Sequence, residues 1–562
     1  MMNMVQKITE QIREIVGESV KGCIDKGILN IENIPEIQVE IPREREHGDF
    51  STNIAMVLAK QAKKSPVAVA RDIVENADYE GTYVDSMEIA GPGFINFRLN
   101  NLWLYKTVEI IHNENEDYGR VNIGQGKKVM VEFVSANPTG PMHMGNARGA
   151  ALGDSLAAVL DAAGYDVTRE FYINDAGNQV EKFGKSLEAR YLQLFGLDAE
   201  VPEGGYQGED LIDLMKELKE RDGDKYLDMD SEERQQVFIR YALKKNLDKI
   251  RTDLANFGVN FDVWFSEQSL YDSGEISDTI EYLKEKGYTY EQEGAIWFKA
   301  SEFGVEKDEV LIRSNGIPTY FAGDIAYHRN KFITRGYDWV INIWGADHHG
   351  HVPRMKGAVE ALGVNPDRLD VIIMQLVRLL REGEVVRMSK RRGKAITLSD
   401  LIEEVGKDAA RFFFNLRAAD THLDFDLDLA VEKSSENPVF YVQYAHARIC
   451  SILNQIVQEG IQVPAIDGIN LTLLKENAEI DLMRKLAELP EEITRAAMTI
   501  EPTRVTRYVL EVAALFHVFY NTCRVMVEDE SLMMARIALI EATRIVIANV
   551  LRLLSISAPE RM

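Results

Sequence analysis

The first part of the chain combines helix-like and strand-like hydrophobic patterns. Apolar residues recur at helical spacing near the amino terminus, at Val5, Ile8, Ile12, Ile15 and Val16. Residues 37–41 alternate apolar and polar side chains, as in a half-buried strand, and Gly91-Pro-Gly93 separates two further strand-like runs. The pattern predicts a small α+β domain over residues 1–118.

A different pattern follows, in which strand-like and helix-like segments take turns. Residues 129–134 form a strand-like apolar run, which leads through a loop rich in proline and glycine into an alanine-rich helical stretch over residues 146–163. Further strand-like runs cover residues 166–173, 339–344 and 371–377. Strand, loop and helix in this order begin a βαβ unit. We expect a split, Rossmann-type parallel sheet over residues 119–395, with an insertion near residues 190–300.

The remainder of the pattern is helical. Residues 200–233, inside the expected insertion, hold 13 acidic and 4 basic residues, which is typical of an exposed segment. From about residue 429 almost every segment has helical periodicity, with one apolar face formed by Ile537, Ile540, Ile547, Leu551 and Leu554. We therefore expect a connector over residues 396–430 and an all-helical bundle over residues 431–562, which completes a multidomain α/β chain.

Composition and charge restrict the class of protein. A chain of 562 residues with 46% hydrophobic and 27% charged residues folds into several globular domains and is neither disordered nor fibrous. The 64 basic and 90 acidic residues give a net charge of −26, so any nucleic acid must meet a local basic patch.

Cysteine usage and hydropathy bear on the compartment. Cys23, Cys450 and Cys523 lie far apart, which indicates neither a disulfide framework nor a thiolate zinc site. The amino terminus lacks the apolar core of a signal peptide, and no uncharged apolar stretch approaches the roughly 20 residues of a membrane span. We expect a cytoplasmic protein that does not enter a membrane.

The loop after the first strand of the expected sheet has the chemistry of a phosphate site. It runs from Ser135 to Asn146 and enters a long helix, the position at which open α/β sheets bind nucleotides. Gly145 lets the backbone approach a ligand, the helix start offers free N–H groups, and His143 and Asn146 add donors for a charged transition state. The alternative is a tight turn with a structural histidine.

A basic segment far downstream supplies the missing positive patch. Residues 378–394 hold seven basic and two acidic residues, and the segment Arg387-Met-Ser-Lys390-Arg-Arg-Gly-Lys394 lies at its end. A loop cation of this kind can neutralise a triphosphate as pyrophosphate departs. The alternative is a solvated basic loop or a nonspecific contact with RNA.

Taken together, the two motifs resemble the HIGH and KMSKS motifs of class I aminoacyl-tRNA synthetases, and the wider sequence resembles the arginyl-tRNA synthetase family of bacterial type. The resemblance spans nearly the whole chain and includes the segments 48–53, 131–146, 171–179, 261–266, 345–350 and 437–448. Two departures are Asn146 at the fourth position of the first motif, and Arg387 and Arg391 at the ends of the second. The central Lys390 is present, so the resemblance implies a functional catalytic motif.

A pocket for arginine needs carboxylates and flat hydrogen-bonding or stacking partners, because a guanidinium is a planar and permanently charged fork. Tyr320 and Asp324 are four residues apart and share one face if their segment is helical, although such a pair is also an ordinary feature of a helix start. The family resemblance implies that Asp324, Tyr320 and Glu132 hold the guanidinium, and that Asn137 and His348 serve the α-amino end.

The resemblance also implies the nucleotide site. His143, Asn146 and Lys390 are the expected catalytic residues, and the expected ATP ligands are Ser135, Gly145, Gly345, Asp347, Met388 and Ser389. Zinc bound by Asp347, His348, His349 and His351 is the alternative for that cluster. We expect Mg²⁺ only as the ion that accompanies ATP, no metal held by the protein itself, and no tightly bound cofactor.

The carboxy-terminal helices carry aromatic and cationic residues suited to RNA. Aromatic stacking and phosphate pairing are the means by which single-stranded RNA loops are read, although helical aromatics more often belong to a core. By the family resemblance the bundle contacts the anticodon arm and the amino-terminal domain contacts the outer corner of the tRNA. The expected tRNA-binding residues are Asn53, Tyr441, Gln443, Tyr444, Arg448 and Arg524.

The sequence thus predicts a monomeric enzyme that activates L-arginine with ATP and transfers it to the 3′ end of tRNA(Arg). Two rivals remain at this point. One is a different class I synthetase, with lysine as the most awkward competing substrate, because a carboxylate attracts either cation. The other is a catalytically inactive tRNA-binding paralogue, which the intact motifs disfavour.

Overall fold

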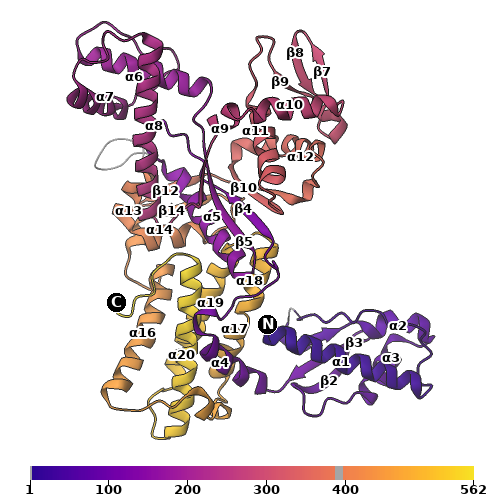
Figure 1. Cartoon of the computed structure of the whole chain (residues 1–562). Helices are drawn as coiled ribbons and strands as arrows, with labels where there is room; N and C mark the ends of the chain where they lie inside the picture. The colour runs from indigo at the N-terminus through magenta and orange to yellow at the C-terminus, as the bar shows by residue number, and fades with distance from the viewer. Residues whose placement is uncertain (1–2, 43, 387–395) are drawn as a thin grey trace.

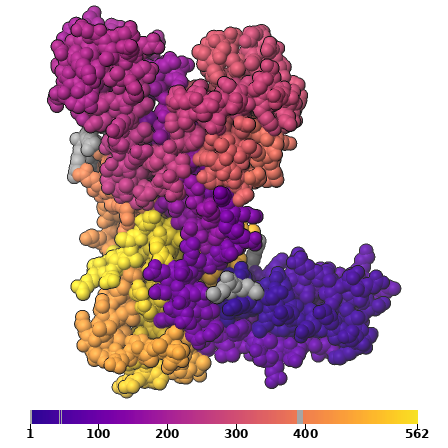
Figure 2. All heavy atoms as spheres, in the orientation of Figure 1, coloured from indigo at the N-terminus to yellow at the C-terminus, as the bar shows by residue number. Residues whose placement is uncertain are grey.

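The computed structural model describes residues 3–42, 44–386 and 396–562. Four parts are distinct in Figure 1: an amino-terminal domain, a central parallel sheet with two lobes above it, a connector, and a long helical bundle. Figure 2 shows the amino-terminal domain projecting sideways from the body, and the two lobes standing apart at the opposite end of the molecule.

The amino-terminal domain is the predicted α+β unit. It contains α1 (Met4–Asp25), β1 (Phe50–Thr52), α2 (Ile54–Ala62), α3 (Pro66–Asn76), β2 (Val84–Ala90) and β3 (Phe94–Leu99), and its antiparallel sheet has the order β1-β3-β2. The apolar face of α1 is buried as its spacing predicts. The strand expected over residues 37–41 is wrong: only Glu40 forms an isolated bridge, to Ser51. Prolines at positions 35 and 42 enclose this segment and limit its strand pairing.

The central sheet is parallel and five-stranded. Its strands are β4 (Lys128–Glu132), β5 (Asp166–Ile173), β6 (Val263–Ser266), β10 (Trp339–Gly345) and β11 (Leu369–Met374), in the order β11-β10-β4-β5-β6. Helix α5 (Met144–Ala162) packs on one face of the sheet, and α11 (Tyr320–Arg329) and α12 (Val352–Ala361) belong to the core on the other. The strand order reverses between β4 and β10, so the carboxyl ends of these two strands mark the expected ligand site.

Two lobes separate the halves of the sheet. The first is a helical lobe with its own core, formed by α6 (Asn178–Leu194), α7 (Glu209–Asp222) and α8 (Ser231–Asn256). The second combines α9 (Gln268–Asp272), α10 (Glu275–Glu285) and an antiparallel sheet of β7 (Thr289–Gln292), β8 (Ala295–Phe298) and β9 (Glu309–Ile312). Figure 1 shows the two lobes on opposite sides of the sheet's carboxyl edge.

The connector and the bundle complete the described chain. The strands β12 (Val377–Arg381) and β13 (Glu384–Val386) follow the central sheet, and the connector then holds α13 (Leu398–Val405), α14 (Lys407–Phe414), β14 (Leu423–Asp426) and α15 (Leu427–Val431). The bundle consists of α16 (Pro438–Gln458), α17 (Asn477–Ala487), α18 (Leu489–Met498), α19 (Thr503–Thr522) and α20 (Glu530–Leu553), and α4 (Leu102–Glu114) packs against α17 and α20. The strand expected over residues 371–377 is interrupted at Gln375 and Leu376, which separate β11 from β12.

Short helical turns link these elements. They cover Arg45–His47, Asn115–Asp117, Ala300–Phe303, Asn330–Thr334, Ala346–His351, Pro366–Arg368, Ile466–Gly468 and Leu471–Leu473.

A buried arginine joins the central sheet, the connector and the bundle. The guanidinium of Arg411 is fully buried and donates to Asp154 Oδ2 of α5 at 2.6 Å, to Leu554 O at 2.6 Å and to Phe257 O at 3.2 Å. Burial lowers the pKa of Arg411, and Asp154 opposes that shift. Because one charged group fixes three parts of the chain, helix α5 is positioned by the bundle as well as by the sheet.

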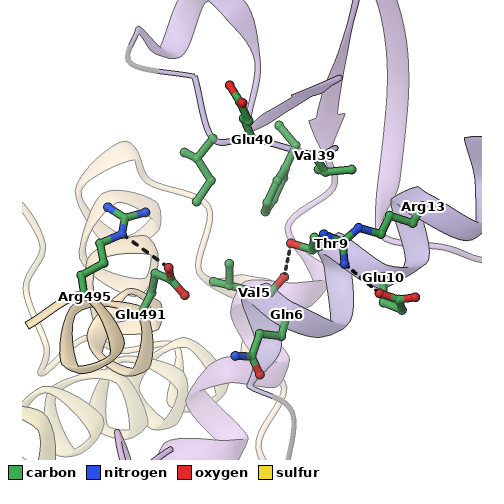
Figure 3. Close-up of a pocket in the computed structure, with 11 residues that line it drawn as sticks. Val5, Gln6, Thr9, Glu10, Arg13, Val39, Glu40, Glu491 and Arg495 are labelled. Atoms are coloured by element: carbon green, nitrogen blue, oxygen red, sulfur yellow. Dashed lines mark hydrogen bonds and ion pairs between the residues drawn. The ribbon is translucent and has the colours of Figure 1, made fainter. Parts of the chain in front are cut away.

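A polar cleft of about 640 Å³ lies between α1 and α18 (Figure 3). Its cations are matched, because Arg13 pairs with Glu10 at 3.1 Å and Arg495 pairs with Glu491 at 3.4 Å. The cleft is formed by the amino-terminal domain and the bundle, and neither sequence motif contributes to its lining.

Candidate active site and RNA-binding surfaces

The first motif lies at the carboxyl edge of the sheet, as its sequence predicts. His143 precedes the first turn of α5 and has extended backbone geometry; its exposed side chain makes no capping hydrogen bond. Helix α5 lies close to the end of β4, because a Cβ atom on Gly153 would be 2.2 Å from Phe133 Cγ. The free N–H groups of α5, the imidazole of His143 and the half-buried Asn146 are therefore available at one edge.

The loop before this motif is held in an unusual backbone conformation. Val134 and Ser135 have φ values of 70° and 40°, a region that residues other than glycine rarely adopt. The Ser135 hydroxyl donates to Glu132 Oε1 at 3.0 Å and accepts from the Tyr172 N–H at 3.2 Å. This hydroxyl, an expected ATP ligand, thus fixes the loop to β4 and β5.

The first motif pairs with residues that follow the second motif in the sequence. The Met144 N–H donates to Ile396 O at 3.2 Å, the Leu398 N–H donates to Met142 O at 3.1 Å, and His143 and Thr397 form an antiparallel bridge. Met388, Ser389 and Lys390 lie outside the described residues. The chain that follows the second motif therefore pairs with the first, more than 240 residues earlier in the sequence.

The end of β10 borders the same edge. Glu132 of β4 is in register with Asn342 of β10, and Gly345 ends the latter strand three residues later. Asp347 follows with a largely exposed carboxylate, and His348 Nε2 lies 3.4 Å from Asp347 Oδ2. Gly345 and Asp347 thus lie where an adenosine would reach the strand ends.

The expected arginine residues on α11 share one face, since the segment is a helix. Tyr320 begins α11 and is half exposed, and Asp324 lies one turn later. The partner of Asp324 is His351, with His351 Nε2 at 3.0 Å from Asp324 Oδ2. His348, the expected ligand of the α-amino group, pairs with Asp347 instead of approaching Asp324. The exposed Asn137 donates to Gln179 Oε1 at 3.0 Å on α6.

A second acidic group in this pocket was missed by the sequence analysis. Glu267 follows β6 and is only 4% exposed, and its carboxyl group makes no hydrogen bond or ion pair with the described residues. Its Oε1 lies 3.8 Å from the position of a Cβ atom on Gly323, beside Asp324. Burial, followed by the charges of Asp324 and Asp175, raises the pKa of Glu267 to about 8. A carboxylate that is costly to ionise and lacks a partner is suited to receive a cation.

The only available signal for Glu267 was its place directly after the family segment 261–266. An isolated Glu after a short strand has no distinctive spacing, so its role depends on the fold that brings β6 beside α11.

Glu132 lies deeper than expected and already has a cation. Its Oε2 accepts from Lys331 Nζ at 2.5 Å, and Lys331 is fully buried. Lys331 Nζ also donates to Asn342 Oδ1 at 3.0 Å, and Asn342 Nδ2 lies 3.0 Å from His328 Nε2. Burial lowers the pKa of His328 well below its usual value. The charge of Glu132 is therefore matched within the protein, whereas that of Glu267 is not.

The alternative zinc cluster does not converge on one point. His351 faces Asp324, whereas Asp347 pairs with His348. Over residues 3–42, 44–386 and 396–562, the group that brings three potential ligand atoms within 4.8 Å of one another is the exposed trio Glu44, Glu46 and His47.

The expected anticodon residues fall into two groups. Tyr444 and Arg448 of α16 meet α19, where Arg448 Nη1 donates to the Tyr444 hydroxyl at 2.8 Å and Nη2 donates to the Tyr520 hydroxyl at 2.6 Å. The ring of His517 lies 4.6 Å from that of Tyr441 and 6.0 Å from that of Tyr444, where it is stacked. These side chains form a platform of aromatic rings with one guanidinium.

The other expected RNA ligands lie apart from this platform. Gln443 donates to Asp408 Oδ2 and to Ser557 O, both at 3.0 Å, so it links α16 to the connector and the carboxy-terminal tail. Arg524 is exposed just after α19. Asn53 precedes α2 without a capping hydrogen bond from its side chain, so its amide is available to a ligand.

The parallel sheet with its reversed strand order, and the pairing of the first motif at its carboxyl edge with the chain at Ile396–Leu398, are those of a class I aminoacyl-tRNA synthetase. Residues 107–424 match the model described as "tRNA synthetases class I (R), catalytic domain". Residues 6–99 match the arginyl tRNA synthetase N terminal domain, and residues 442–562 match the DALR anticodon binding domain. The chain belongs to the arginyl-tRNA synthetase family, and it is an arginine–tRNA ligase.

Individual relatives agree over the full length. The chain is 62% identical over 562 residues to an arginine–tRNA ligase of Caldanaerobacter subterraneus subsp. tengcongensis, and 62% identical over 564 residues to that of Acetivibrio thermocellus, with 100% of each chain covered. The fold is similar to that of the Thermus thermophilus arginyl-tRNA synthetase, with a TM-score of 0.73, 21% identity, and coverage of 99% of this chain and 100% of the other. Membership of this family excludes the alternative hypothesis of a class I synthetase for a different amino acid. None of the helices within the described ranges is both long and apolar enough to cross a membrane.

Proposed function

We propose that the acidic pocket between α9 and α11 binds the guanidinium of L-arginine. Asp324 and Glu267 supply two carboxylates, and Tyr320 supplies a ring and a hydroxyl at the half-exposed rim. A planar fork can bond to two carboxylates at once, which a point charge such as an ammonium does less well. Glu132 lies at the base of the pocket and serves there as a hydrogen-bond acceptor. Its negative charge is already balanced by Lys331.

The α-amino end of arginine lies toward the first motif. Asn137 and His348 are the proposed partners, since both are exposed at the carboxyl edge of the sheet. This arrangement directs the substrate carboxylate toward His143 and the start of α5.

ATP occupies the space between the two motifs, and Mg²⁺ accompanies its phosphates. His143, Asn146, Gly145 and the N–H groups of α5 face the α-phosphate, while Gly345 and Asp347 face the ribose. On the second motif, Met388, Ser389 and Lys390 complete the site. An oxygen of the arginine carboxylate attacks the α-phosphorus, and the bond to the departing pyrophosphate breaks. His143, Asn146 and Lys390 stabilise the negative charge that develops.

Transfer to tRNA follows on the same surface. The 2′-hydroxyl of the terminal ribose attacks the carbonyl carbon of arginyl-adenylate, and AMP leaves. The platform of Tyr441, Tyr444, Arg448, His517 and Tyr520 stacks on anticodon bases. Asn53 contacts the outer corner of the tRNA, Gln443 and Arg524 contribute to the bundle's contact, and the connector contacts the stem.

The finer assignments complete the proposal. Residues 1–118, 119–395, 396–430 and 431–562 are the four domains, and the enzyme acts as a monomer in the cytoplasm. As the family resemblance implies, activation of arginine requires bound tRNA, so ATP–pyrophosphate exchange without tRNA is silent.

The observation that carries this proposal is the pairing of Met142–Met144 with Ile396–Leu398 at the carboxyl edge of the sheet, together with the buried carboxyl group of Glu267 that follows β6 of the same sheet and lies beside α11. The test is aminoacylation with ATP, tRNA and each of the twenty radiolabelled amino acids in turn. Only arginine should become acid-precipitable. Lysine is the decisive competitor, and its incorporation at a comparable rate would refute the proposed pocket.

A further inference from the structure

Arg148 is a buried arginine of α5 that the proposed reaction leaves without a role. It lies two residues after Asn146 and is fully buried. Its Nη1 donates to Gln375 O at 2.9 Å and its Nη2 donates to Ala418 O at 2.7 Å, whereas its Nε has no hydrogen-bond partner within the described residues. One guanidinium therefore holds two carbonyl groups that belong to distant parts of the chain.

Both carbonyl groups lie at the base of the small sheet that leads to the second motif. Gln375 lies two residues before β12, and the Gln375 N–H donates to Ala419 O at 2.8 Å. Strand β12 pairs in parallel with β14 and antiparallel with β13, which ends at Val386, directly before the second motif. Figure 1 shows β12 and β14 beside α5. Arg148 thus connects the helix that follows the first motif to the described segment that precedes the second.

The described chain on the other side of the second motif is also bonded to the first. The main chain of Ile396 and Leu398 bonds to that of Met144 and Met142. Together with Arg148, these bonds tie the chain before and after the second motif to α5 and the residues at its start. Supports of this kind set the position of catalytic groups without touching the substrate.

Packing provides little support for the same carbonyl groups on one side. Gln375, Ala418 and Ala419 line a pocket of about 490 Å³, whose other walls come from α5, β10, β11 and residues 499–503. Main-chain segments that border open space lack the close packing that fixes most of a protein interior. The two hydrogen bonds of Arg148 are therefore important for the position of these segments.

The electrostatics of Arg148 differ from those of Arg411, which is also fully buried. Arg411 donates to the Asp154 carboxylate at 2.6 Å, whereas Arg148 bonds only to carbonyl oxygens among the described residues. Burial lowers the pKa of Arg148 to about 10, and the charge of Asp420 opposes that shift. A buried cation without an ion pair lowers folding stability. The need to reach two carbonyl oxygens at once accounts for an arginine here, because its donors form a rigid fork.

We propose that Arg148 is a positioning residue for adenylate formation. Its guanidinium fixes the start of β12 against α5, so that β12 and β13 carry the second motif to the ATP phosphates beside His143. Arg148 acts through the second motif and does not touch the substrates, because it is fully buried. The inference rests on the proposed catalytic role of the second motif and Lys390, and it adds a residue on which that role depends.

The test measures single-turnover formation of arginyl-adenylate by the full-length enzyme with tRNA(Arg) present. Arg148→Met removes both hydrogen bonds and should slow this step about a hundredfold, the loss expected when catalytic groups are misplaced by about 1 Å. Arg148→Lys keeps a donor for at least one carbonyl group and should recover part of the rate. The KM for ATP should rise in Arg148→Met, whereas the KM for arginine should not change, because the proposed arginine pocket lies on the other face of the sheet.

A double-mutant cycle with Lys390→Ala distinguishes positioning from a general loss of structure. If Arg148 acts through the second motif, Arg148→Met should slow the step by less than about threefold once Lys390 has been replaced. Arg536→Lys is the matched control for Arg148→Lys, because Arg536 is a buried arginine of the bundle that also donates to a main-chain carbonyl, that of Arg524. Any loss of rate in Arg536→Lys should be the same with and without Lys390.

Three results would overturn the inference: an unchanged rate in Arg148→Met, an equal loss in both backgrounds, or a control variant that depends on Lys390 as Arg148→Lys does. The melting temperature identifies a folding failure of Arg148→Met, in which case the cycle with Arg148→Lys decides by the same criteria. Normal turnover by Lys390→Ala alone would instead contradict the proposed function. The KM for ATP then decides, since a rise in the Arg148 variants at constant KM for arginine supports positioning, and an unchanged KM for ATP refutes it.

Discussion

Arginine affinity should depend on pH through Glu267. The carboxyl group is buried beside Asp324 and Asp175, which raises its pKa to about 8. A guanidinium binds the ionised carboxylate, so the enzyme must release a proton from Glu267 when arginine enters near neutral pH. The perturbations are a change of pH between 7.0 and 8.5 and the substitution Glu267→Gln, which keeps the shape of the side chain and removes its charge.

The expected magnitude follows from the fraction of Glu267 that is ionised. With a pKa of about 8, that fraction is about one tenth at pH 7.0 and about three quarters at pH 8.5. Apparent affinity scales with the competent fraction, so the KM for arginine should fall about eightfold over this range. The KM for ATP should not follow the same curve, because Glu267 lies in the amino-acid pocket.

Stability should report the same ionisation. The folded-state pKa of Glu267 is raised above its unfolded value, so its contribution to stability is complete below pH 4.5 and is lost as pH rises through 8. Bound arginine should offset this loss of stability, because its guanidinium pairs with the ionised Glu267 carboxylate. The rise in melting temperature that saturating arginine produces should therefore increase with pH in the unchanged protein and stay constant in Glu267→Gln. A KM for arginine that does not vary with pH, or that varies equally in both proteins, would refute the role of Glu267.

Three further outcomes test the site. Lys390→Ala should slow adenylate formation by orders of magnitude and leave the Kd for tRNA within a few-fold; normal turnover would separate the basic loop from catalysis. Asp324→Ala should raise the KM for arginine far more than that for ATP, while Asp278→Ala, which removes an exposed acid of α10, should change neither; equal effects of the first variant on both would remove Asp324 from the pocket. Lys331→Met should cost about 3 to 5 kcal/mol in urea denaturation because it leaves the Glu132 carboxylate buried without its cation, and adding Glu132→Gln should recover part of the loss.

The fold was largely predictable because its elements have strong local patterns. The apolar run before Glu132 and the alanine-rich helix after it can form little other than a strand and a buried helix. The failure at residues 37–41 has a local cause too, because alternation over five residues cannot reveal whether a partner strand is present. Alternation over five residues indicates only that every second side chain is buried. An extended segment at the edge of a domain satisfies that pattern as well as a paired strand does.

The position of the first motif at the carboxyl edge of the sheet was predictable for a different reason. A glycine-containing loop that joins a buried strand to a helix in a parallel sheet commonly binds a nucleotide or a phosphate group. The residue types of the first motif specify that function further. Contacts that depend on three-dimensional assembly were not predictable. Lys331 and Glu132 are 199 residues apart in sequence, and nothing near Lys331 distinguishes it from a surface lysine. Gln443 is a residue for which the sequence neighbours were misleading. Its place between Tyr441 and Tyr444 suggests a contact with RNA, whereas its side chain donates a hydrogen bond to Asp408.

The selectivity of the proposed pocket depends on the way in which the two halves of the sheet meet. Glu132 ends a strand of the first half, and Lys331 follows α11 in the second half, so their ion pair joins the halves beneath the proposed arginine site. Had Lys331 been apolar, Glu132 would be a buried carboxylate without its cation and would add an uncompensated negative charge beneath the proposed pocket. The internal lysine therefore limits the negative charge of the pocket. This balance leaves Asp324 and Glu267 as the carboxylates that the proposed pocket offers to one flat cation, and it accounts for a buried ammonium close to a site that we propose attracts a positive charge.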